Sequence, residues 1–227
     1  MLNVIRWFIV TGNTDVNNNI FIEQNRIMGA KESTLQEYID SSMGIHHIKH
    51  LFENESVDTR YSILMNVKGK ENSTWTGLHE ASRINDLENI VLMLTDFSSS
   101  QLYNVVKIQN IYQWTALHYA AVKGYTSIIN YLLNNLSQQQ KYDLLKIQDE
   151  NGNTALHIAA MNKKVEAVQA ITSSVSSHLQ ILLINIKNKK GQTVTDIRPE
   201  LHDELPVLIH RSRSTKLHQV FHSFKFL

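Results

Sequence analysis

Histidine is the residue type in this chain with the clearest capacity for chemistry, because its imidazole titrates near neutral pH and binds metal ions. Three histidines, His79, His118 and His157, follow one another at intervals of 39 residues. A residue that recurs in every unit of a repeat serves the unit itself. Side chains one repeat apart are also too distant to share one metal ion. We therefore predict that these histidines are structural and that the chain has no catalytic residue.

Two further histidine pairs have the i, i+4 spacing that places both side chains on one face of a helix, where they could bind a metal ion. These pairs are His46 with His50, next to His47, and His218 with His222. No carboxylate completes the first set at helical spacing, although Glu53 lies three residues after His50. A solvated helix face is favoured for both pairs, and we predict no metal site.

Other catalytic signatures are missing from the sequence. Cysteine is absent, which excludes a thiol nucleophile, a disulfide framework, a zinc finger and an iron–sulfur site. The run HEAS at 79–82 is not a zinc-binding HExxH motif because Arg83 stands where the second histidine would be. No GxSxG, GxGxxG or GxxxxGK motif is present. We expect neither an enzyme nor a cofactor.

Composition narrows the class of protein further. Of 227 residues, 42% are hydrophobic and 19% charged, which is typical of a globular chain. Two prolines and eight glycines favour helices over a turn-rich β architecture. A net charge of +1 disfavours nucleic acid as a partner. The sequence contains no run of 18 apolar residues, so we predict no membrane-spanning helix. Because Arg6 interrupts the apolar start, a signal peptide is the less favoured interpretation of it.

The histidines belong to a longer repeated sequence motif. Thr-Gly-Leu-His at 76–79 is followed by Thr-Ala-Leu-His at 115–118 and at 154–157, and the next step reaches Thr193, where Asp196 replaces the histidine. Each unit reads as two helices and a turn. Thr115 can cap the first helix, and Gly124 suits its left-handed end. The motif positions that we assign to the structure of the repeat are Thr76, Leu78, His79, Thr115, Leu117, His118, Gly124, Thr154, Leu156 and His157.

This order of turn, threonine, leucine, histidine, alanine pair and glycine resembles the ankyrin repeat. The resemblance implies an all-α solenoid of stacked helix-turn-helix units with hairpin tips. The repeats are 39 residues long instead of about 33. The extra residues fall in segments that each begin with serine, and we predict that each forms a short third helix on the rim opposite the turn tips. These segments are 98–106, 137–145 and 176–184. Lys163 replaces Gly124 in the third repeat, so that loop is expected to differ slightly.

The repeat register predicts the domain organisation. An N-terminal non-repeat or capping segment covers 1–36, the ankyrin domain covers 37–198, and a basic capping helix or tail covers 199–227. The ankyrin domain consists of a degenerate repeat, three clear repeats and a partial repeat, at 37–73, 74–112, 113–151, 152–190 and 191–198.

The resemblance also implies protein–protein recognition through variable residues on the concave face and the turn tips. Trp75, Trp114 and Asn153 each precede a motif threonine, and either the two tryptophans anchor a partner or they pack against each other. The remaining candidate contacts lie on the same tips and at the ends of the first helices, and they are Ile111, Tyr112, Asn151, Arg83, Lys123, Met161 and Asn162. This surface suits a protein partner with apolar and acidic groups.

We expect a monomer that acts in the cytoplasm of the producing cell or of a host cell, with a secreted effector as the alternative. The alternative function is a regulatory or host-targeted effector component that acts on a larger enzyme system.

Overall fold

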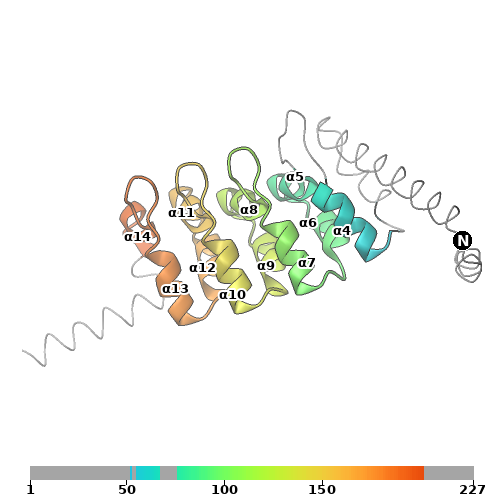
Figure 1. Cartoon of the computed structure of the whole chain (residues 1–227). Coiled ribbons are helices and arrows are strands. Elements are labelled where there is room, and N and C mark those ends of the chain that lie inside the picture. Colours follow the sequence, from blue (N-terminus) through green and yellow to red (C-terminus); the bar gives the residue numbers. More distant parts are fainter. Residues whose placement is uncertain (1–51, 53–54, 67–75, 202–227) are drawn as a thin grey trace, which may run out of the picture.

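The computed structural model describes Phe52, residues 55–66 and residues 76–201. It shows helices in a regular row (Figure 1). The first repeat described in full contains α5 (Gly77–Ile84), α6 (Leu87–Leu94) and α7 (Ser99–Val106). The second contains α8 (Ala116–Lys123), α9 (Thr126–Asn134) and α10 (Gln138–Leu145), and the third contains α11 (Ala155–Met161), α12 (Val165–Ser173) and α13 (Ser177–Ile184). The row begins with α4 (Val57–Asn66) and ends with α14 (Val194–Ile197).

Equivalent helices of successive repeats pack side by side. The first helices form one layer from α5 through α8 and α11 to α14, and the second helices α6, α9 and α12 form another. The helices α4, α7, α10 and α13 form a third row, in which α4 takes the place of a third helix from a preceding repeat. This arrangement confirms the predicted all-α ankyrin solenoid and the additional short helix in each repeat.

The first helix of each repeat begins and ends through local interactions. Thr76, Thr115 and Thr154 are extended N-cap residues, and the chain turns left-handed at the end of each helix. Gly124 makes that turn with a φ of 81°. The third repeat keeps the left-handed conformation at Lys163, with a φ of 56°, although α11 ends one residue earlier than α8 in the repeat register. The turn is therefore retained despite the loss of glycine.

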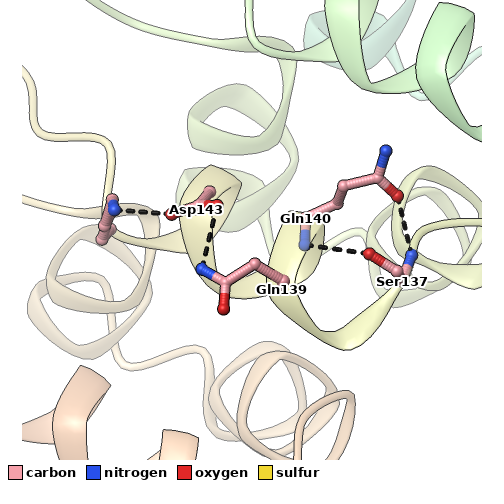
Figure 2. A network of polar contacts seen from close by, with 5 residues as sticks. Ser137, Gln139, Gln140 and Asp143 are labelled. Carbon is pink, nitrogen blue, oxygen red and sulfur yellow. Dashed lines mark hydrogen bonds and ion pairs between the residues drawn. The ribbon is translucent and has the colours of Figure 1, made fainter.

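Each third helix has a serine at its N-cap position, and in α7 and α10 the serine side chain caps the helix. In α10, the Ser137 hydroxyl accepts the N–H of Gln140, whose side chain accepts the N–H of Ser137 in return (Figure 2). This reciprocal pair is a capping box, and Ser98 with Gln101 repeats it in α7. The Gln140 side chain also bonds the hydroxyl and carbonyl groups of Ser99, so the capping residue joins two neighbouring third helices.

The core lies between the layers and repeats with them. Leu78, Leu117 and Leu156 are fully buried on the first helices, against an apolar layer from the second helices. The Ser82 hydroxyl is buried on the first helix α5 without a hydrogen-bond partner. Alanine occupies the equivalent position in the next two repeats.

Several sequence predictions fall outside the described residues. These predictions concern the segment 1–36, the first part of the degenerate repeat, Trp75, the two histidine pairs and residues 202–227.

Candidate functional site

Hairpins project beyond the first helices (Figure 1). In each of the hairpins 110–114, 149–153 and 188–192, one side chain bonds two backbone N–H groups. In the hairpin 149–153, the Asp149 Oδ1 accepts the backbone N–H groups of Asn151 and Asn153 at 2.9 and 2.7 Å. Asn110 and Asn188 make the same pair of bonds in the hairpins 110–114 and 188–192. A short side-chain acceptor at this position therefore gives all three tips one conformation.

The motif histidines fasten each hairpin to the preceding repeat. The backbone N–H of Thr76 can only donate, and it bonds the Nδ1 of His79 at 3.1 Å, so Nδ1 is the acceptor and Nε2 carries the proton. That Nε2–H reaches the Trp114 carbonyl of the next repeat at 3.0 Å. His118 and His157 repeat both bonds, toward the carbonyls of the two following hairpins.

Burial keeps these histidines neutral. Desolvation lowers the pKa of His79 and of His118 to about 4, although hydrogen bonds to backbone carbonyls oppose the shift. Desolvation also lowers the pKa of His157. All three imidazoles bond backbone groups of their own repeat and of the following hairpin.

Neighbouring hairpins are also bonded directly to each other. The Gln109 amide donates to the Gln148 carbonyl at 3.2 Å, and the Gln148 amide donates to the Lys187 carbonyl at 2.9 Å. The Lys189 N–H adds a backbone bond to the Asn151 carbonyl at 3.0 Å. The three tips therefore form one connected edge.

A groove of about 640 Å³ lies between these hairpins and the helices α8 and α11. Its lining combines aromatic, aliphatic, amide and charged side chains. The lining residues are Tyr112, Trp114, Tyr119, Asp149, Glu150, Asn151, Asn153, Ile158, Met161, Asn188, Lys190 and Gln192.

Five residues selected from the sequence meet in this groove, namely Tyr112, Trp114, Asn151, Asn153 and Met161. Tyr112 and Met161 are 51% and 42% exposed and offer apolar surface there. The Trp114 ring is half-buried against the ring of Tyr119, with 4.9 Å between centroids.

One of the five side chains, that of Asn153, makes its contacts within the fold. Asn153 is only 7% exposed, its amide lies 3.4 Å from the Asp149 carboxylate, and its carbonyl oxygen accepts from the Asn188 amide at 3.1 Å. Little of the Asn153 side chain is therefore accessible to a partner. Its side chain instead connects two hairpins at the base of the groove.

The other selected residues lie outside the groove lining. Ile111 is 57% exposed on its hairpin. The Arg83 guanidinium forms a two-bond ion pair with Glu80, which raises the pKa of Arg83. Lys123 is exposed and makes no ion pair within the described part of the chain, while the Asn162 amide bonds the Ile158 carbonyl of its own helix at 2.8 Å.

Two helix residues that line the groove were not predicted from the sequence. Tyr119 and Ile158 occupy equivalent positions one repeat apart, where Glu80 stands in the preceding repeat. Because function in repeat proteins is carried by positions that vary between repeats, this variation could have identified both residues from the sequence. Glu150 and Lys190 were not selected either, and the sequence gives no comparable signal for them. Only the stacking of the repeats brings these two hairpin residues to the groove.

Comparison with known proteins supports the architecture. The family model for "Ankyrin repeats (3 copies)" matches residues 44–143 and 78–181, which together cover more than half of the chain. The chain therefore belongs to the ankyrin repeat family, whose members are generally protein–protein interaction modules and typically non-catalytic. No curated protein matches the chain significantly.

The described residues also bear on a membrane span and on a metal site. None of the described helices is long and apolar enough to cross a membrane. Within the same residues, no three histidine, aspartate or glutamate side chains converge on a candidate metal site.

Proposed function

We propose that this protein is a non-catalytic interaction module that binds a partner protein through the groove and the hairpin tips around it. The observation that carries the proposal is a groove lined by partly exposed apolar and aromatic side chains between hairpins that are bonded to one another. A surface held in its binding conformation loses little conformational entropy on association. Tyrosine and tryptophan supply much of the binding energy in protein interfaces, and both line this groove.

The proposal that the protein is non-catalytic is based on the hydrogen bonds of the three motif histidines. His79, His118 and His157 are buried and fastened to backbone carbonyls, so no imidazole of the motif is placed to move a proton on a substrate. We further propose a protein that is monomeric without its partner and acts in the cytoplasm of the producing or the host cell.

Affinity capture with quantitative mass spectrometry tests the proposal. The wild type is compared with a groove variant, Tyr112→Ala with Met161→Ala, and with a matched control, Met65→Ala with Leu182→Ala. The control residues are exposed hydrophobic side chains, 39% and 40% exposed, but they lie on α4 and α13 and outside the groove lining. We expect a partner that the wild type and the control retain and the groove variant loses. Equal recovery by all three folded proteins would contradict the proposal.

The captured partner also tests the alternative function. An effector component of a larger enzyme system requires that the partner be an enzyme whose rate changes when the wild-type chain is added. The groove variant should leave that rate unchanged.

A further inference from the structure

Three aromatic side chains gather at one end of the groove. Trp114 and Tyr119 meet with their ring planes at 57°, and Tyr112 from the same hairpin as Trp114 lines the groove beside them. Burial raises the pKa of Tyr119, and the nearby Tyr112 adds to this shift. The face of an aromatic ring carries partial negative charge and attracts a cation placed within about 6 Å of its centre.

Asn110 bonds the Tyr119 side chain and the Trp114 backbone. Its amide donates to the Tyr119 hydroxyl at 2.9 Å, and its carbonyl oxygen accepts the Trp114 backbone N–H at 3.0 Å. The Tyr119 ring also stands perpendicular to the imidazole of His79, with 6.1 Å between centroids. That imidazole is neutral above pH 6 because its pKa is about 4, so it adds no positive charge beside the rings.

The charges around the groove favour a cation over an anion. The lining contains two carboxylates, the exposed Glu150 and the buried Asp149, against one ammonium group, that of Lys190. The positive charge of Arg83 near Tyr119 is neutralised by Glu80 through a hydrogen bond of 2.9 Å and a second, shorter contact. The sequence-based expectation of acidic groups on the partner depended on Arg83 and Lys123. Neither residue lines the groove.

We propose that the aromatic end of the groove binds a positively charged side chain of the partner protein, with its charge between the rings of Tyr112, Trp114 and Tyr119 and the carboxylate of Glu150. The aliphatic stem of such a side chain packs on Met161 and Ile158, which line the same groove. Arginine and lysine, methylated or not, share this chemistry. The inference rests on the proposed function and specifies the chemistry of the partner.

Methyl NMR of the full chain labelled at methionine tests the inference directly. Met161 reports on the groove, and Met65 on α4 is an exposed internal control. The probes are the N-acetyl N-methylamides of arginine, lysine and trimethyl-lysine, with citrulline as the neutral isostere of arginine and glutamate as the acidic probe. We expect saturable shifts of the Met161 methyl with the cationic probes, about fivefold weaker binding of citrulline, and no shift of Met65. The order among the cationic probes identifies the form of the side chain.

Two surface variants and a matched control complete the test. Tyr112→Ala and Glu150→Gln remove exposed groups and should each weaken the binding of the arginine probe about threefold or more. Tyr142→Ala removes a tyrosine that packs under Lys146 on α10, and it should change nothing at Met161. Equal binding of arginine and citrulline, tighter binding of glutamate, or an unmoved Met161 methyl would each overturn the inference. A protein that captures its partner through the groove without such a preference refutes this inference alone and leaves the proposed function standing.

Discussion

Acidification from pH 7 to pH 5 should destabilise the repeat array through its buried histidines. The pKa of His79 and of His118 is about 4 in the folded protein, against the ordinary value of 6.5 in the unfolded chain. The unfolded chain therefore binds more protons between these values. The stabilisation is fully present above pH 6.5 and is lost as the pH falls toward 4. Each histidine lowers the free energy of unfolding by about 2 kcal/mol between pH 7 and pH 5, or about 4 kcal/mol together.

Chemical denaturation followed by far-UV circular dichroism at pH 7, 6 and 5 measures this loss. The matched variant is His118→Gln, because glutamine at the equivalent position of the third helices, as in Gln101 and Gln140, completes a capping box without titrating. The variant is expected to be less stable at pH 7, since it loses the bond from His118 to the Asn153 carbonyl. Its pH dependence should be smaller than that of the wild type by about 2 kcal/mol.

Two results would refute this reasoning. A wild-type free energy of unfolding that stays constant from pH 7 to pH 5 would show that the imidazoles are not held neutral by burial. An unchanged pH dependence in His118→Gln would place the titration on other groups. His157, whose pKa is also lowered, contributes in the same direction and is present in both proteins.

Three further predictions concern stability and are measured by the same denaturation assay. Leu117→Ala should lower the free energy of unfolding by about 2–5 kcal/mol, because the side chain is buried in the layer of first helices, and an unchanged value would disprove its role in the core. Gly152→Ala should cost more than Gly191→Ala. Both residues have positive φ, but only at Gly152 would the new Cβ lie 2.6 Å from a backbone nitrogen, that of Lys189, and equal costs would speak against this close approach. Ser82→Ala should raise the stability by about 1 kcal/mol, because it removes a buried hydroxyl without a partner, and a loss of stability would reveal a bond to that hydroxyl.

The elements of this protein are encoded locally, and the sequence was therefore sufficient to predict them. Threonine caps, left-handed turns and the Ser98–Gln101 type of capping box act within four residues, so the 39-residue period determined where each helix begins. The Arg83–Glu80 ion pair is equally local, at a spacing of i, i+3, and could have been predicted from the same pattern.

Tertiary structure alone decided which residues form the groove. Asn153 is buried, and its side chain accepts a hydrogen bond from the Asn188 amide. Asn188 lies on the next hairpin, 35 residues further along the chain. Glu150 and Lys190 come to the same groove from different repeats. Burial and proximity depend on how neighbouring repeats stack, and no single repeat contains that information.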